Sequence, residues 1–133
     1  MDKRFEWALL AMEAAVRRDG LLDITAGGYD SVTLPSFSVP GRIVAATSIR
    51  VDNSDPLELE LVMEIVAPSG AVIATRRDRF LTDSTNLLPG EASRTSVVME
   101  HDRVDFEETG RHIVRLMCDD DVAELDVTVR PLG

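Results

Sequence analysis

The sequence predicts an all-β protein, an antiparallel β-sandwich of about seven to nine strands, and two observations support this prediction. Several segments alternate apolar and polar residues with a period of two, which is typical of strands with one face in a core and one in water. Turn signals rich in Pro, Gly and Asp separate these segments. The chain has 133 residues, of which 44% are hydrophobic and 29% are charged. These values are typical of one globular domain, so we treat residues 1–133 as a single domain.

The clearest predicted strand runs from Leu57 to Ala67. Apolar residues alternate there with glutamates, namely Leu57, Leu59, Leu61, Met63 and Ile65 with Glu58, Glu60 and Glu64. Pro68-Ser69-Gly70 then predicts a hairpin turn. The next segment, residues 71–81, begins apolar and becomes basic. A charged strand of this kind suits a sheet edge, where charge discourages pairing with another sheet.

The carboxyl-terminal third predicts a second hairpin. Residues 111–118 place His112, Val114, Leu116 and Cys118 on one strand face, and residues 123–130 alternate throughout. Asp119-Asp120-Asp121 lies between the two strands and predicts a tight turn. Residues 43–51 form another alternating set and residues 97–100 a weaker one, whereas residues 86–91, which contain Pro89-Gly90, predict a loop.

The amino-terminal third is less regular. Residues 22–26 alternate until Gly27-Gly28 interrupts them, and Val32 and Leu34 resume the pattern before Pro35 and Pro40, which bracket a stretch that is no central strand throughout. Residues 5–17 fit two structures. Phe5, Leu9, Met12 and Val16 lie at helical spacing among good helix formers, but Phe5, Trp7, Leu9 and Ala11 would share one face of a strand. Propensity by itself favours the helix.

The composition is strongly acidic, because 14 Lys and Arg residues against 24 Asp and Glu residues give a net charge of −10. Such a surface repels phosphate backbones and anionic lipid headgroups, so we expect neither nucleic-acid nor membrane partners. The single cysteine, Cys118, excludes an intrachain disulfide. The amino end makes a poor signal peptide, and no run of about 18 apolar residues suggests a membrane span. We therefore expect a cytoplasmic protein.

One order of residues resembles a known family. The following segments carry the resemblance, in chain order: Trp7-Ala8-Leu9-Leu10-Ala11, Asp19-Gly20, Leu22-Asp23-Ile24, Ala26-Gly27-Gly28-Tyr29-Asp30, Pro35, Pro40, a strand at residues 42–51 and Gly110-Arg111-His112. The chain resembles a family of short, uncharacterised bacterial proteins of unknown function with an immunoglobulin-like β-sandwich. The resemblance covers nearly the whole chain and brings no catalytic residues.

That resemblance implies a strand, an Asp-Gly turn and a second strand in the first segment. We therefore predict strand over residues 5–17, against the helical pattern, because pairing in a sheet overrides propensity. The resemblance also implies a corner near the second-last strand, where many such sandwiches carry a tyrosine whose hydroxyl makes a hydrogen bond. His112 stands in that place, and an imidazole nitrogen is able to make a similar bond.

Candidate metal ligands are scarce. Asp119–Asp121 has the oxygen ligands that Ca²⁺ takes, but the spacing matches no known calcium motif, and a solvated turn explains it. His101 and His112 lack the paired spacing of a zinc site. His101 lies among charged neighbours, whereas His112 shares a face with apolar residues. We expect no metal and no cofactor.

Candidate catalytic groups are equally weak. Cys118 precedes three aspartates that disfavour a thiolate, so a small buried hydrophobe is expected. Glu58, Glu60 and Glu64 line an open strand face without the enclosed cleft that carboxylate catalysis needs. The Gly27-Gly28 segment lacks the Gly-Lys-Ser of a phosphate-binding loop and predicts a bend. We expect no enzymatic activity.

Two groups of residues are candidates for interaction. Tyr29 and Asp30 follow the bend at a strand restart, where exposure would suit recognition. Arg76, Arg77 and Arg79 form a basic island that pairs either with glutamates of a second copy, as a homodimer, or across strands of the same chain. The sequence thus favours a non-enzymatic interaction or accessory domain with an unknown protein partner. The alternatives are a small-molecule or calcium-binding β-sandwich and an assembly subunit that forms oligomers.

Overall fold

The computed structural model describes residues 3–37, 39–52, 57–82 and 87–131, and these form ten strands. The strands are β1 (Lys3–Ala11), β2 (Glu13–Val16), β3 (Leu22–Thr25), β4 (Ser31–Leu34), β5 (Gly41–Val51), β6 (Glu58–Val66), β7 (Val72–Leu81), β8 (Ser93–Val104), β9 (Gly110–Cys118) and β10 (Asp121–Pro131). The prediction of an all-β protein is confirmed over the described residues. No helix in this part of the chain is long and apolar enough to cross a membrane.

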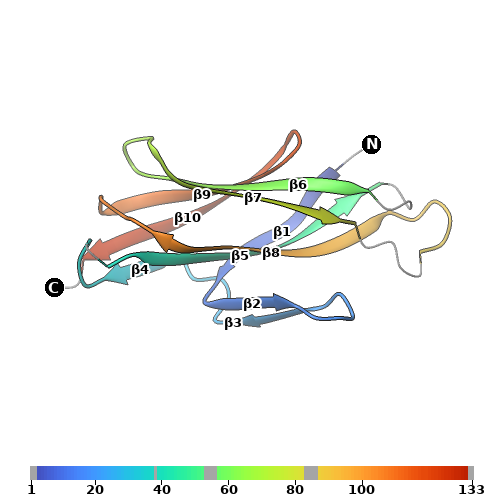
Figure 1. Cartoon of the computed structure of the whole chain (residues 1–133), viewed down its shortest axis with the longest axis horizontal. Coiled ribbons are helices and arrows are strands. Elements are labelled where there is room, and N and C mark those ends of the chain that lie inside the picture. The colour runs from blue at the N-terminus through green and yellow to red at the C-terminus, as the bar shows by residue number, and fades with distance from the viewer. Residues whose placement is uncertain (1–2, 38, 53–56, 83–86, 132–133) are drawn as a thin grey trace.

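Three layers make up the fold (Figure 1). A five-stranded sheet in the order β4-β10-β9-β6-β7 faces a three-stranded sheet in the order β1-β5-β8. At their sides β1 contacts β10 and β7 contacts β8, so the two sheets approach each other at both margins. The β2–β3 hairpin forms the third layer, against β5 and β8 on the outer face of the three-stranded sheet. The three-stranded sheet is therefore the middle layer.

The core lies between the two larger sheets and consists of the inward residues of the alternating strands. In β6 Leu59, Leu61, Met63 and Ile65 are buried, as the alternation predicts, and Val66 at the end of the strand is buried as well. Each such side chain contributes roughly 1.5–3 kcal/mol when it leaves water. Phe106, from the segment between β8 and β9, is 1% exposed and lies against Gly41. A Cβ atom at Gly41 would stand 2.6 Å from Cε2 of that ring, so any larger residue there would force the ring to move.

Residues 5–17 are strand, and the prediction that relied on the family resemblance is confirmed. They contribute β1 and β2, with a break at Met12 between them. The reason lies in β5, which is almost completely buried along its length and needs backbone partners on both edges. β1 pairs with β5 from Lys3 to Ala11 and so supplies one of those edges. The sheet pairing outweighs the helix propensity of the same residues.

The predicted turns join the predicted strands. Gly20 (φ 82°) closes the β2–β3 hairpin and Gly70 (φ 91°) the β6–β7 hairpin, both in the left-handed region that favours glycine. Between β9 and β10 the turn uses Asp119 (φ 54°) and Asp120, whereas Asp121 already belongs to β10 and pairs with Cys118. The predicted three-residue turn is thus one residue too long.

Other details of the predicted sandwich need correction. Of the ten strands in the described residues, eight form the two facing sheets, and the other two form the β2–β3 hairpin, which packs outside the predicted sandwich. The sheets are not wholly antiparallel, since β4 pairs parallel with β10 from Ser31 to Leu34. Residues 97–100 belong to the twelve-residue β8. Of the loop predicted at 86–91, position 86 lies outside the described residues, and residues 87–91 are not strand.

Candidate functional site

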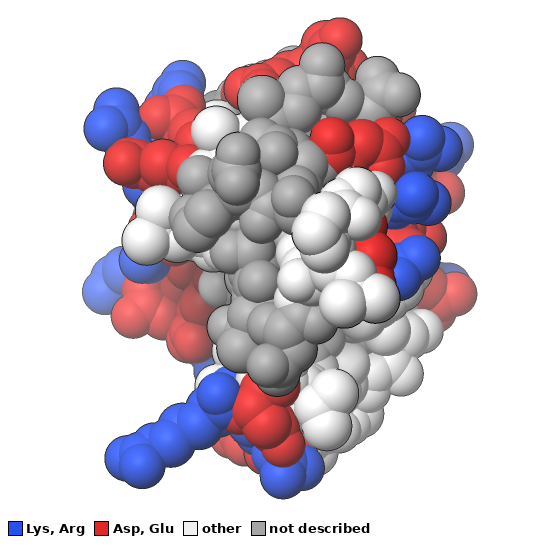
Figure 2. Space-filling view, turned by 90° about the vertical axis from the view of Figure 1, so that its right-hand side faces the viewer, with Lys and Arg blue, Asp and Glu red and all other residues white. Residues whose placement is uncertain are grey.

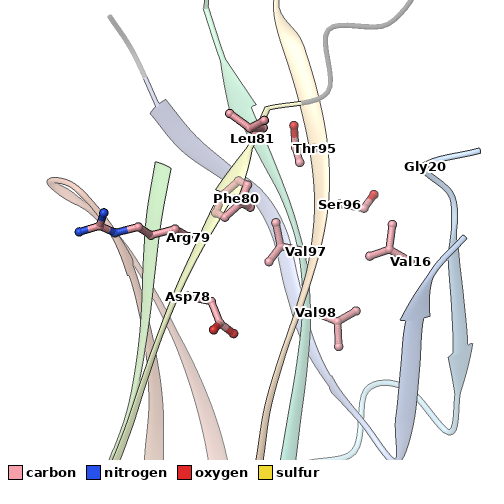
Figure 3. Close-up of a pocket in the computed structure, with 10 residues that line it drawn as sticks. All are labelled: Val16, Gly20, Asp78, Arg79, Phe80, Leu81, Thr95, Ser96, Val97 and Val98. Atoms are coloured by element: carbon pink, nitrogen blue, oxygen red, sulfur yellow. The ribbon is translucent and has the colours of Figure 1, made fainter. Parts of the chain in front are cut away.

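A slot beside β8 is a concave feature of the described residues. In this part of the structure β8 pairs with β5 on one side and with no strand on the other. The free side opens into a cavity of about 420 Å³ that three layers line. Residues 78–81 of β7 line it from the five-stranded sheet, residues 95–98 of β8 form its floor, and Val16 and Gly20 come from the hairpin (Figure 3).

The slot has two apolar walls, one on each side of the β8 backbone. Phe80 and Val97 lie on the side that faces the core, and Val98 lies with Val16 on the side of the hairpin (Figure 3). Leu81 is 67% exposed at the end of β7, and Val16 is 45% exposed. These two side chains expose apolar surface at the rim of the slot.

Along this edge the backbone groups of Ser96 and Val98 have no strand partner among the described residues. Arg76 Nη1 donates a hydrogen bond to the carbonyl oxygen of Glu100 at 3.2 Å, from the β7 side. In a strand the N–H and C=O of one residue point to the same side, and the side alternates from residue to residue. If Glu100 points toward β7, Val98 and Ser96 present their backbone N–H and C=O to the slot as well.

Charged residues at the slot are already paired within the chain. Arg76 and Asp78, both on the inward face of β7, form an ion pair at 3.4 Å. An inward charge on an edge strand is one of the devices that keep such edges from pairing with other sheets. Arg79 contacts Glu58 and Glu60 at 3.7 Å. The slot itself therefore needs no counter-charge from a partner.

Arg42 ties the hairpin layer to β8. Its Nε donates to Glu100 Oε1 at 2.7 Å, and its Nη1 donates to the backbone carbonyl of Met12, between β1 and β2, at 2.6 Å. The hydrogen bond from Arg42 lowers the pKa of the Glu100 carboxyl, helped by the attraction of the Arg42 charge and opposed by partial desolvation. Both side chains are exposed, so this pair contributes little to stability.

The basic island of the sequence divides between two faces. Arg77 donates to Glu60 Oε1 at 3.1 Å across the β6–β7 pair, and Arg79 contacts the same strand, so the cross-strand pairing within one chain is formed. Arg115 and Arg111 continue the pattern with carboxylates of β6 and β10. Figure 2 shows positive and negative side chains interspersed on both flanks of one end of the molecule. A homodimer through Arg77 and Arg79 would have to replace these pairs.

Tyr29 and Asp30 lie apart from the slot, just before β4. The expected strand restart is present, but the Tyr29 ring is half-buried and packs against the core cluster. This burial raises the pKa of the Tyr29 hydroxyl, and the nearby positive charge of Arg42 opposes the rise. The Asp30 side chain is exposed, while its carbonyl oxygen accepts the N–H of Thr128 at 2.8 Å. Of this pair, the Asp30 side chain is the one available to a partner.

The candidate metal ligands do not converge in the described residues. No group of three His, Cys, Asp or Glu side chains there could hold a metal ion. In the Asp119–Asp121 segment, Asp121 Oδ2 instead accepts the backbone N–H of Phe5 at 2.7 Å and so holds β1 to β10. Cys118 is buried, as expected of a small core residue.

His112 is a core residue. Its side chain is 0% exposed and meets the Phe106 ring edge-on at 5.1 Å between centroids. Its Nδ1 lies 3.1 Å from the carbonyl oxygen of Gly110, to which it donates in the matching tautomer. This is the type of local bond expected from an imidazole in the corner position. Its Nε2 has no hydrogen-bond partner among the described groups.

Sequence reasoning did not identify the slot residues. The one signal was at Val97-Val98-Met99, where apolar residues occupy both faces of a strand. Such a run indicates cover on both sides, and the hairpin and β7 supply that cover. The exposed Val16 and Leu81 gave no signal, because their proximity arises only from the layered packing.

Comparison with solved structures places the fold among domains of larger enzymes. The chain superposes on Pseudomonas fluorescens alkylpurine DNA glycosylase AlkC bound to DNA with a TM-score of 0.57 and 12% identity, over 96% of this chain and 30% of that one. It superposes on a glycosyl hydrolase family 2 member from Bacteroides cellulosilyticus with a TM-score of 0.50 and 12% identity, over 95% of this chain and 15% of that one. At such identity these likenesses concern the fold.

The chain thus spans less than a third of the length of these two proteins. No curated protein matches it. A family model described as a family of unknown function, DUF6941, matches residues 6–130.

Proposed function

The chain belongs to DUF6941, a family of unknown function, and from that premise we propose that it is a non-enzymatic interaction or accessory domain that binds a protein partner through the edge of its middle sheet. The slot beside β8 carries the proposal, because it joins unpaired backbone groups to two apolar walls. Sheet edges of this kind bind partners by adding a strand, with main-chain hydrogen bonds for affinity and side-chain pockets for specificity.

Two further observations support an accessory role. The outer face of the five-stranded sheet carries cross-strand ion pairs, such as Arg77 with Glu60 and Arg111 with Asp126, which suit a solvated surface. In addition, folds of this shape occur as one part of much longer enzymes. The proposal includes the immunoglobulin-like classification and the bacterial setting that the family resemblance implies, and the cytoplasmic setting expected from the sequence.

Site-specific photo-crosslinking in native cells tests this proposal. A photoreactive amino acid is placed at three positions of the full chain, which are Ser96 beside the slot, Asp30 before β4 and Thr75 on the outer face of β7. Cross-linked products are identified by mass spectrometry. We expect a defined protein adduct from at least one position, with a yield that falls when unlabelled chain is added. A chain that cross-links to no specific protein from any of the three positions has no partner of the proposed kind.

A further inference from the structure

The free edge of β8 is recessed between two other layers. β7 contacts β8 on its core-facing side, and β2 of the hairpin contacts it on the other side. The middle sheet has three strands at this level while the sheet above it has five. At this margin β8 is the last strand of the middle sheet among the described residues, and the slot beside it extends along residues 95–98. At a strand rise of about 3.3 Å per residue, this floor is roughly 13 Å long.

The floor of the slot, residues 95–98 of β8, is long enough for a short added strand. Neighbouring strands in a sheet lie about 4.8 Å apart, so a chain beside β8 occupies the space between the β7 side and the hairpin side. Its side chains would alternate between the two walls, with one set against Phe80 and Val97 and the other against Val16 and Val98. Both walls are apolar, so both sets are best filled by β-branched residues.

The recess determines which kind of occupant fits. The β8 edge of a second copy lies between its own β7 and its own hairpin, so two such edges cannot approach to hydrogen-bonding distance without a clash of the flanking layers. Two copies also repel each other, since each carries a net charge of −10. A single extended segment without flanking layers meets neither obstacle.

The charges at and around the slot limit which residues the bound segment carries. The ionic groups at the slot, Asp78 and Arg79, already have partners within the chain, so the residues inside the slot are best uncharged. At longer range the net charge of −10 on the whole chain attracts positive charge, which favours basic residues at the two ends of the segment.

We propose that the slot binds an extended peptide segment of another protein, which adds to β8 as a fourth strand of the β1-β5-β8 sheet. The segment is apolar and β-branched over about four residues and is flanked by basic residues. This proposal rests on the proposed function and specifies both its site and the class of its partner.

The test uses a defined probe, the fluorescein-labelled peptide Lys-Lys-Thr-Val-Thr-Val-Thr-Lys-Lys, titrated with the full chain and followed by anisotropy. Two further peptides carry backbone N-methyl groups. One carries them on both valines, and the other carries them on the threonines between the lysine pairs. In an added strand only one of these sets of N–H groups faces β8, because the direction alternates along the strand. We expect one N-methylated peptide to lose binding and the other to retain it.

Matched variants of the protein locate the binding. Val16→Lys changes the hairpin wall, while Val122→Lys is the control, since Val122 is 49% exposed on β10 and does not line the slot. We expect Val16→Lys to weaken binding about tenfold and Val122→Lys to leave it within about twofold of wild type. Val98→Pro removes an N–H from the free edge and should weaken binding about tenfold as well. Circular dichroism checks that each variant is folded.

Three results would overturn the inference. The first is no binding of the probe at millimolar protein, because edge addition relies on main-chain groups that any extended peptide has. The second is equal binding of both N-methylated peptides, or equal loss from Val16→Lys and Val122→Lys, which indicates attraction by charge without strand addition. The third is a dimer of the wild-type chain that Val98→Pro dissociates, because the slot would then bind a second copy of the chain. If native cells give an adduct at Asp30 or Thr75 but none at Ser96, the proposed function survives and this inference fails.

Discussion

Alanine at Gly41 tests how tightly the core closes around Phe106. The added Cβ would lie 2.6 Å from Cε2 and 3.0 Å from Cδ2 of the ring, whereas carbon atoms normally pack at about 3.5–4.0 Å. The ring must therefore retreat by roughly 1 Å. It has little room, because Phe106 is 1% exposed and its ring meets the buried His112 edge-on.

The expected loss of stability follows from two opposing effects. Overpacking of a core costs about 1–3 kcal/mol. Alanine also restricts the unfolded chain, which restores about 0.4–1 kcal/mol. With about 2 kcal/mol for overpacking and about 0.7 kcal/mol for the restricted unfolded chain, the net loss for Gly41→Ala is about 1.3 kcal/mol. Each kcal/mol lowers Tm by about 3–5 °C in a domain of this size. Urea unfolding measures the net loss, followed by circular dichroism and by the fluorescence of Trp7, the one tryptophan of the chain.

A second background identifies the cause of the loss. Phe106→Leu shortens the side chain that the new methyl group meets, so Gly41→Ala should cost little when Phe106→Leu is already present. The double-mutant cycle then gives a coupling energy of about 1 kcal/mol or more. An equal cost of Gly41→Ala in both backgrounds, or no cost in either, would refute the argument that the ring needs the space above Gly41.

Two other predictions concern single contacts. Tyr29 is the one tyrosine of the chain, so absorbance near 295 nm should show its hydroxyl titrating above pH 10, and Arg42→Gln should raise this pKa further because the Arg42 charge lowers it. Since the pKa of Tyr29 is raised in the folded state, the corresponding stability is present below the unfolded pKa of about 10 and is lost as the pH rises through the folded value. A Tyr29 titration that is unchanged in Arg42→Gln would contradict the effect of the Arg42 charge on this pKa. Asp121→Ala should cost about 1–3 kcal/mol of unfolding free energy, because it leaves the Phe5 N–H without its acceptor, whereas its exposed neighbour Asp120→Ala should cost under about 0.5 kcal/mol. Equal costs in denaturant unfolding would mean that the Phe5 contact does not stabilise the protein.

Local pattern was sufficient to predict the hairpins. The strands β6 and β9 each carry a core residue at every second position, and each is followed closely by its partner across a short turn. Their faces and their pairing therefore follow from neighbouring residues. The same reasoning identified β7 as an edge strand, because its arginines are too frequent for a central one.

Features that depend on residues far apart in the sequence were not predicted from such local patterns. A period of two assigns residues to faces but does not say which sheet a strand joins, so the position of the β2–β3 hairpin was not predicted. The slot depends on this position, because Val16 comes from the hairpin. The parallel pairing of β4 with β10 joins residues about a hundred positions apart and has no local signal. Tyr29 shows the same limit, since its burial depends on how this distant pairing closes over it.

The contacts between the two ends of the chain have a consequence for synthesis. β1 is held by Asp121, and β4 pairs with residues 128–131. A ribosome makes the amino-terminal strands first, yet β4 has no strand partner until the last residues of β10 leave the exit tunnel. Pairings this far apart in sequence also close slowly. During translation the apolar strands at the amino end therefore remain without their complete sheet, and this nascent chain is the form most exposed to aggregation and to chaperones.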